Sequence, residues 1–169
     1  MTTTVKLYSL NFSQYKTYLF AALFVAGNLI LPQLCHLVPM GGNMLLPIYF
    51  FTLIAAYKYG LKVGLLTAIL SPLANSLLFG MPALAFLPII LIKSALLATF
   101  AAVAANQFKK ISFVGILLAV IAYQIVGAGF EWAMTQNFAI AAEAVRLALP
   151  GMAIQLVGGY AILKSIAKV

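Results

Sequence analysis

The sequence predicts an all-α integral membrane protein: one domain over residues 1–169, with six transmembrane helices and both termini in the cytoplasm. The chain is 65% hydrophobic and only 7% charged, and its mean hydropathy is +1.12. A soluble single domain of this size cannot bury so much apolar surface. Six apolar runs, separated by short polar or Gly/Pro-containing turns, give the helix count. The positions of the lysines, described below, give the orientation.

The first two apolar runs predict two helices joined by an irregular loop. The first helix is expected over residues 15–31, with Pro32 ending it. Residues 32–43 contain two prolines and a Gly-Gly pair, a composition typical of a loop. Because Cys35 is the only cysteine of the sequence, an internal disulfide is excluded. The second helix, over residues 44–57, is short for a full crossing. We therefore expect it to be tilted or shielded by its neighbours.

A tight basic turn over residues 57–62 leads into the third helix, with Gly60 as the candidate C-cap. This helix is expected over residues 63–78, and Pro72 is expected to kink it. The Gly-Met-Pro sequence within residues 79–82 is the next turn.

The fourth helix, residues 87–106, is apolar except for Lys93 and a few hydroxyl groups. Twenty helical residues span about 30 Å, the thickness of the hydrocarbon core, and Pro88 lies in the first turn, where its missing N–H costs nothing. A lysine at this depth costs about 2.5–3.5 kcal/mol on insertion scales. Lys93 should therefore face protein, water or a ligand; the alternative is that it snorkels to the nearer interface.

The fifth helix is expected over residues 111–130 and the sixth over residues 150–164. Between them, residues 131–149 form the longest connection. Within it, apolar residues share one helical face while Glu143 and Arg146 lie three residues apart on another. This pattern indicates a short amphipathic helix at the interface, or a lid.

The basic residues fall almost entirely on one side of this six-helix arrangement. Only Lys93 and Arg146 lie toward the other side. The positive-inside rule then predicts that both termini lie in the cytoplasm. The net charge of +8 does not indicate nucleic acid, because the basic residues are scattered rather than clustered on a stripe. The eight on the cytoplasmic side are Lys6, Lys16, Lys58, Lys62, Lys109, Lys110, Lys164 and Lys168.

Five helices each place one amide or charge in the outer half of the membrane, which predicts a common ligand cavity. Such groups cost free energy in hydrocarbon unless they find partners. The alternative is that they are interhelical hydrogen bonds, worth about 0.6–2 kcal/mol each. Five further residues could close over the cavity, namely Glu131, Trp132, Gln136, Asn137 and His36. Trp132 also suits a membrane-interface anchor and His36 an ordinary loop residue. The candidate binding residues are Asn28, Asn75, Lys93, Gln124, Gln155, Glu131, Trp132 and His36.

Nothing in the sequence indicates an enzyme. It contains no nucleotide-binding P-loop and no H-E-x-x-H motif. The sequence has only two acidic residues and one histidine, so it offers very few side chains for a metal site or for acid–base catalysis. No cofactor is expected. An ion channel needs a polar path through both leaflets, whereas here the polar residues within the helices lie only in the predicted outer half. A half-depth pocket suits capture of a ligand rather than conduction.

Three short motifs resemble those of the substrate-binding (S) components of energy-coupling-factor (ECF) vitamin transporters. Residues 22–26 (ALFVA) resemble the A-x-x-x-A coupling motif on the first helix of that family. Residues 59–64 (YGLKVG) and 79–82 (FGMP) are similar to its G-x-x-x-G turn and its outer Gly-Pro turn. The resemblance extends over nearly the whole chain, although small-xxx-small motifs also occur in many other membrane helices.

The resemblance implies a six-helix protein that captures a small water-soluble vitamin or related micronutrient outside the cell. It implies docking, through Ala22 and Ala26, on a transmembrane coupling subunit driven by two ATPase subunits. Lys93 would suit a carboxylate or phosphate on an anionic substrate. The alternative is a membrane scaffold protein of the rod-shape (cell-elongation) type, which is similar in size and helix count. A scaffold needs no pocket, so its amides would satisfy one another.

Overall fold

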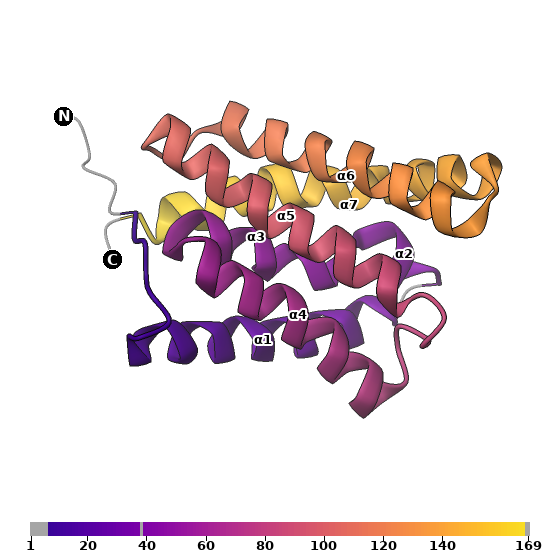
Figure 1. Cartoon of the computed structure of the whole chain (residues 1–169), viewed down its shortest axis with the longest axis horizontal. Coiled ribbons are helices and arrows are strands. Elements are labelled where there is room, and N and C mark those ends of the chain that lie inside the picture. Colours follow the sequence, from indigo (N-terminus) through magenta and orange to yellow (C-terminus); the bar gives the residue numbers. More distant parts are fainter. Residues whose placement is uncertain (1–6, 38, 168–169) are drawn as a thin grey trace.

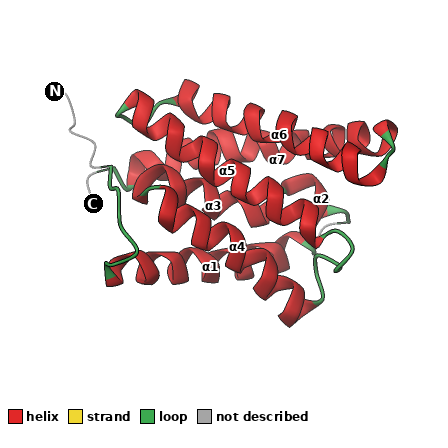
Figure 2. Cartoon of the chain, in the orientation of Figure 1, coloured by secondary structure: helices red, strands yellow, loops and turns green. Residues whose placement is uncertain are grey.

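The computed structural model describes residues 7–37 and 39–167, and all the regular structure in these ranges is helical. Short loops connect the helices, which lie side by side as a bundle (Figures 1 and 2). The helices are α1 (Tyr15–Cys35), α2 (Gly41–Leu45), α3 (Pro47–Tyr59), α4 (Leu61–Phe79), α5 (Leu87–Phe108), α6 (Phe113–Thr135) and α7 (Phe138–Ser165).

Five of these helices, α1, α4, α5, α6 and α7, are long and apolar enough to cross a membrane. They contain between 19 and 28 residues each, which is the length that a hydrocarbon core of about 30 Å requires. The chain is therefore a multi-pass membrane protein. The remaining predicted transmembrane helix corresponds to α3, which has 13 residues and is too short to cross a membrane as a straight helix.

Helix α3 forms the centre of the bundle. Eleven of its 13 residues are buried, and it packs against α1, α4, α5 and α7. The prediction that this short helix is shielded by its neighbours is confirmed. Its predicted start at residue 44 was three residues early, because Pro47 occupies the first turn, a position that suits proline.

The turn between α3 and α4 depends on two glycines. Gly60 ends α3 with φ of +96°, a backbone conformation that side chains disfavour, and its N–H donates to the carbonyl of Ala56 at 3.1 Å. The predicted C-cap is confirmed. One turn later, a Cβ on Gly64 would lie 2.4 Å from the Cβ of Ala56. The two helices can approach this closely only because residue 64 has no side chain.

The predicted end of the first helix at Pro32 was wrong. Helix α1 continues through Pro32 to Cys35, and the His36 N–H donates to the Pro32 carbonyl at 2.9 Å. Proline removes one N–H donor and its ring crowds the carbonyl four residues earlier, a cost of about 3 kcal/mol that packing against neighbouring helices can offset. Part of the predicted 32–43 loop is therefore helical, since α2 occupies its last residues and continues to Leu45.

The prediction of a long connection with a separate amphipathic helix over residues 131–149 was also wrong. Helix α6 extends to Thr135, and α7 begins at Phe138 after only two residues. The Asn137 side chain caps α7 by accepting hydrogen bonds from the N–H groups of Ala139 (3.0 Å) and Ile140 (3.3 Å). Helix α7 then runs for 28 residues through Pro150, the residue that the sequence suggested as the start of a helix.

The fourth and fifth predicted helices correspond to α5 and α6. Pro88 lies in the first turn of α5, as predicted, and α5 packs closely along α6. The buried face of α5 is rich in alanine, which lets neighbouring helices approach closely. The alanines on this face are Ala98, Ala101, Ala102, Ala104 and Ala105.

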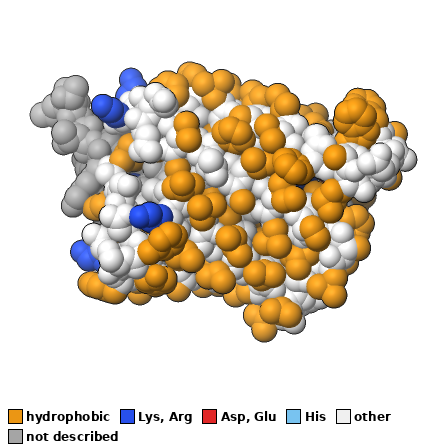
Figure 3. All heavy atoms as spheres, viewed as in Figure 1, with side chains coloured by type: hydrophobic (Ala, Val, Ile, Leu, Met, Phe, Trp, Pro, Cys, Tyr) orange, Lys and Arg blue, Asp and Glu red, His pale blue; other side chains and the backbone are white. Residues whose placement is uncertain are grey.

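The two ends of the bundle differ in charge. At one end, which we call the lysine end, lie the start of α1, the α3–α4 and α5–α6 turns and the end of α7; its blue side chains appear at the left of Figure 3. Both ends of the described chain meet there, because the Tyr8 N–H donates to the Lys58 carbonyl (2.9 Å) and Lys58 Nζ donates to the Ala167 carbonyl (3.3 Å). Lys6 and Lys168 lie outside the described residues. The opposite end is called the cavity end below.

Candidate functional site

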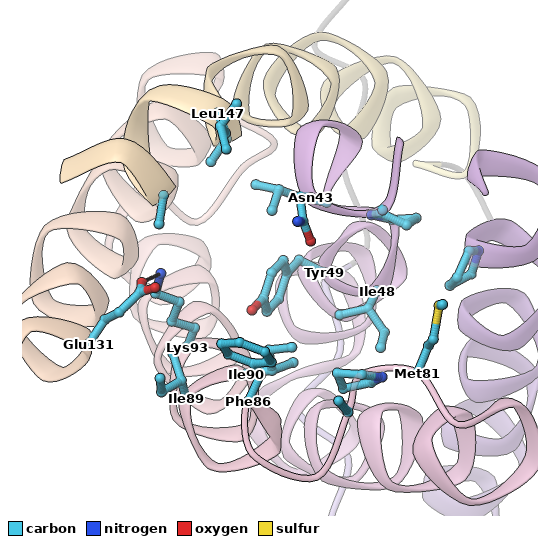
Figure 4. Close-up of a pocket in the computed structure, with 18 of the residues that line it drawn as sticks. Asn43, Ile48, Tyr49, Met81, Phe86, Ile89, Ile90, Lys93, Glu131 and Leu147 are labelled. Carbon is cyan, nitrogen blue, oxygen red and sulfur yellow. Dashed lines mark hydrogen bonds and ion pairs between the residues drawn. The ribbon is translucent and has the colours of Figure 1, made fainter. Parts of the chain in front are cut away.

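A cavity of about 790 Å³ opens at the cavity end of the bundle. Its wall is built from the end of α1, from α2, the start of α3, the α4–α5 loop, and the adjoining parts of α5, α6 and α7 (Figure 4). Most of the lining is aliphatic or aromatic, with a few polar groups, which is typical of small-molecule sites. Four of the predicted binding residues line it: His36, Lys93, Gln124 and Glu131.

Lys93 and Glu131 form an ion pair in the wall, joining α5 to α6. Lys93 is 8% exposed and Glu131 is 9% exposed. Lys93 therefore does not snorkel to an interface; it is neutralised by a carboxylate within the same chain. A buried pair of this kind is tolerated because each charge stabilises the other, whereas either charge alone would be costly.

The Lys93 side chain reaches Glu131 across a glycine. A Cβ on Gly127 would lie 2.6 Å from Lys93 Cγ and 3.1 Å from Lys93 Cε. The aliphatic part of the lysine thus occupies the place of a side chain on α6. The pair depends on the absence of a side chain at residue 127 as well as on its two charges.

Two uncharged polar side chains complete the inner wall. Tyr49, in the first turn of α3, is 4% exposed, and Figure 4 shows its hydroxyl directed into the cavity. Gln124 of α6 is 3% exposed, and its Oε1 has no hydrogen-bond partner among the described residues. Tyr49 also packs on Tyr123, with ring centroids 5.7 Å apart, and this contact holds its ring in place.

The rim is formed by α2 and the residues around it. Met40 and Leu46, which flank α2, have φ of 57° and 50°, a left-handed conformation that costs about 1–2 kcal/mol for a residue with a side chain. Helix α2 rests on α7 at Gly151, where an added Cβ would lie 2.7 Å from backbone atoms of Met44 and Leu45. Close backbone packing therefore fixes this short helix over the cavity.

The first turns of α7 provide the opposite side of the rim. Glu143 lines the cavity and accepts a hydrogen bond from Arg146 at 3.4 Å, with both side chains largely exposed. His36 also lies at the rim and is exposed, with its ring against Gly42. Among the described residues, no three His, Cys, Asp or Glu side chains lie close enough together to hold a metal ion.

Asn28 and Asn75, which the sequence assigned to the cavity, lie elsewhere in a network between α1, α3 and α4. Asn28 Nδ2 donates to Thr52 Oγ1 (3.2 Å) and to Ser71 Oγ (3.0 Å). Asn75 Nδ2 donates to the carbonyls of Asn28 (2.8 Å) and Ser71 (3.0 Å). These amides join three helices by hydrogen bonds. Such a role was the alternative to ligand binding in the sequence analysis.

Gln155 and Trp132 also lie outside the cavity wall. Gln155 Oε1 accepts a hydrogen bond from the Tyr123 hydroxyl at 3.2 Å, between α6 and α7. Trp132 is 53% exposed and packs edge-on against Phe138, with ring centroids 5.9 Å apart. It lines a separate apolar groove of about 480 Å³ between α6 and α7, as does Gln124. Gln124 thus separates the groove from the cavity.

Ala22 and Ala26 are exposed on the outer face of α1. They do not pack against other helices of this chain, which was the alternative to a partner-docking role. Leu19, Leu23 and Ile30 are exposed on the same helix. This face is therefore available to lipid or to another membrane protein.

The cavity also contains residues that sequence reasoning did not identify. Tyr49, Asn43 and Phe86 carry no charge and belong to no motif, so only their position reveals them. The sequence predicts Glu143 on a separate interfacial helix because it predicts that a helix begins near Pro150. A proline inside α7 gives no sequence signal that distinguishes it from a proline at a helix start.

Comparisons with protein-family models, curated proteins and solved structures find no match to this chain. The site must therefore be interpreted from its own chemistry.

Proposed function

We propose that this protein is the substrate-capture subunit of an ECF-type transporter for a small water-soluble vitamin or related micronutrient. The observation that carries the proposal is the cavity of about 790 Å³ at the end of the bundle opposite the lysines. Its size and its mainly apolar lining with a few polar groups fit one small molecule.

The charge distribution supports an outward-facing cavity. Six of the eight basic residues in the described ranges lie at the lysine end: Lys16, Lys58, Lys62, Lys109, Lys110 and Lys164. By the positive-inside rule this end faces the cytoplasm, and the cavity then faces the outside of the cell (inner) membrane of a bacterium or archaeon.

Energy for uptake would come from partners. In the proposed assembly, a transmembrane coupling subunit docks on the outer face of α1 at Ala22 and Ala26, and two ATPase subunits drive it. Exposed alanines four residues apart leave a shallow strip that a partner helix can approach closely.

The test is whether the purified protein binds a small molecule. Protein extracted in mild detergent is analysed by native mass spectrometry for a retained non-lipid ligand and screened for thermal stabilisation by small metabolites. We expect one ligand at a 1:1 ratio with a raised melting temperature. A folded protein that retains nothing and is stabilised by nothing would contradict the proposal.

A membrane scaffold of the rod-shape type is the second candidate, and one observation favours it. The Asn28 side chain, Asn75 Nδ2 and the Lys93–Glu131 pair find their partners within the chain, as a protein without a ligand would require, although Asn75 Oδ1 has none among the described residues. The same screen separates the two functions, since a scaffold gives no specific stabilisation by a small molecule.

A further inference from the structure

The cavity contains two buried polar side chains that the protein itself does not satisfy. Tyr49 and Gln124 are 4% and 3% exposed. Gln124 Oε1 is buried without a hydrogen-bond partner among the described residues, and the Tyr49 hydroxyl, which faces the cavity, makes no hydrogen bond with a described residue. Their neighbour Tyr123 differs, because its hydroxyl is already bonded to Gln155. A buried polar group without a hydrogen-bond partner lowers the stability of the folded protein. Two such groups in one cavity wall indicate a ligand that supplies the partners.

The charged groups of the cavity are already paired. Lys93 bonds Glu131, and Glu143 is bridged by Arg146. Within the described wall, His36 is the remaining side chain able to carry positive charge, and it is exposed at the rim. An anionic ligand would therefore meet two carboxylates and would have to displace one of them from Lys93. An uncharged ligand meets no such cost.

Apart from Asn43 of α2, which is exposed, the wall beside Tyr49 and Lys93 is apolar. Phe86, Ile89 and Ile90 line one side beside Lys93, and Ile48 lies on the other side of Tyr49 in Figure 4. Aliphatic and aromatic side chains of this kind pack well against the faces of a flat ring. The polar atoms of Tyr49 and Gln124 can then bond only the ligand's edge.

We propose that the cavity selects an uncharged, ring-containing ligand with a carboxamide-like edge, which is bound by the Tyr49 hydroxyl and the Gln124 amide. Such an edge has a donor beside an acceptor, and both side chains can donate and accept. The Lys93–Glu131 pair is then a fixed, electrically neutral part of the wall. This inference rests on the proposed function, because it assigns a ligand class to the same cavity. It replaces the expectation of an anionic substrate.

The test is a competition between uncharged and anionic compounds that share a ring. Purified protein in detergent is equilibrated with a protein-free small-molecule extract of the expression host. The extract is supplemented with nicotinamide and nicotinate, biotin amide and biotin, and thymidine and thymidine monophosphate. Molecules retained after gel filtration are identified by mass spectrometry, and their dissociation constants are measured. The variants are Tyr49→Phe and Gln124→Met, with Tyr123→Phe and Gln155→Met as matched controls outside the wall.

We expect wild-type protein to retain an uncharged molecule. Tyr49→Phe and Gln124→Met should each weaken its binding by about three- to tenfold, the value of one neutral hydrogen bond, and the two controls should change it by less than about twofold. Two variants are used so that one remains informative if the other fails to fold. Retention of an anion, or undiminished binding in both variants, would overturn the ligand class while leaving the proposed function intact. Retention of nothing by folded wild-type protein would overturn the proposed function itself.

Discussion

Lys93 of α5 and Glu131 of α6 form an ion pair inside the apolar part of the molecule, with nine-tenths of each residue buried. The two residues are 38 positions apart in the sequence, so the pair forms only when both helices are in place. It links α5 to α6, and it leaves the cavity wall without net charge at this point.

Breaking this pair should destabilise the protein more than removing it altogether. Lys93→Met or Glu131→Gln alone leaves one buried group without its partner, which costs about 3–5 kcal/mol when the remaining group is charged. The double variant Lys93→Met/Glu131→Leu leaves no buried charge and should recover most of the loss. The measurement is the free energy of unfolding in an SDS titration.

The exposed pair of Glu143 and Arg146 is the control for this prediction. Removing Arg146 should change the free energy of unfolding by less than about 1 kcal/mol, because surface pairs contribute little. A double variant that is less stable than either single variant would show that the charges of Lys93 and Glu131 are not coupled.

Gly127 should be required for the same pair. Its Cβ in a Gly127→Ala variant would lie 2.6 Å from Lys93 Cγ, so the lysine must move away from Glu131. Gly129 is the matched control, since nothing lies within 4 Å of a Cβ added there. We expect a lower melting temperature for Gly127→Ala and an unchanged or higher one for Gly129→Ala. Similar melting temperatures for the two variants would contradict this role.

The fold was largely predictable from the sequence because apolar length and glycine turns are local signals. Gly60 and Pro88 occupy the positions expected from their backbone preferences. The errors came from Pro32 and Pro150, which both lie inside helices. Whether a helix continues through a proline depends on the packing of other helices around it, and a single sequence does not contain this information.

The candidate site was predictable only in part, for a related reason. Lys93 and Gln124 were identified because a polar residue in an apolar helix is a local signal. The position of each polar residue along its helix was predictable, but the direction of its side chain around the helix was not. Asn28 therefore faces Thr52 and Ser71 instead of the cavity.

Replacing Asn28 should separate stability from binding. Asn28→Leu removes hydrogen bonds to two side chains and the acceptor for the Phe51 N–H (3.3 Å), so we expect a loss of about 1–3 kcal/mol. The dissociation constant for any retained ligand should stay within about twofold, because Asn28 is not part of the cavity wall. The two measurements are an SDS titration and equilibrium binding by the folded fraction. A large loss of affinity at unchanged stability would instead place Asn28 in the binding site.

The orientation of the bundle can be tested with reporter fusions. Fusions after Lys110 and Ser165 should report the cytoplasm, because these residues lie at the lysine end. A fusion after Gln136, in the turn between α6 and α7 at the cavity end, should report the outside. Alkaline phosphatase and green fluorescent protein give opposite signals at each site. A cytoplasmic signal after Gln136 would place the cavity on the inside and contradict external capture.

The last prediction concerns the outer face of α1. Ala22→Trp combined with Ala26→Trp adds two large rings on an exposed strip, so the isolated protein should fold and bind its ligand within a few-fold of wild type. If a coupling subunit docks there, the rings should prevent the close approach of its helices. Co-purification with the coupling subunit and uptake into cells should then both be lost.

A matched control uses α6, where Val114 and Leu118 are also four residues apart and are each 54% exposed. Val114→Trp with Leu118→Trp adds similar bulk to an exposed face outside the proposed docking strip, so uptake should persist. Normal uptake in the α1 variant would remove Ala22 and Ala26 from the docking surface. Loss of uptake in both variants would show that added bulk, rather than the α1 strip, is responsible. Only a loss confined to the α1 variant supports docking at Ala22 and Ala26.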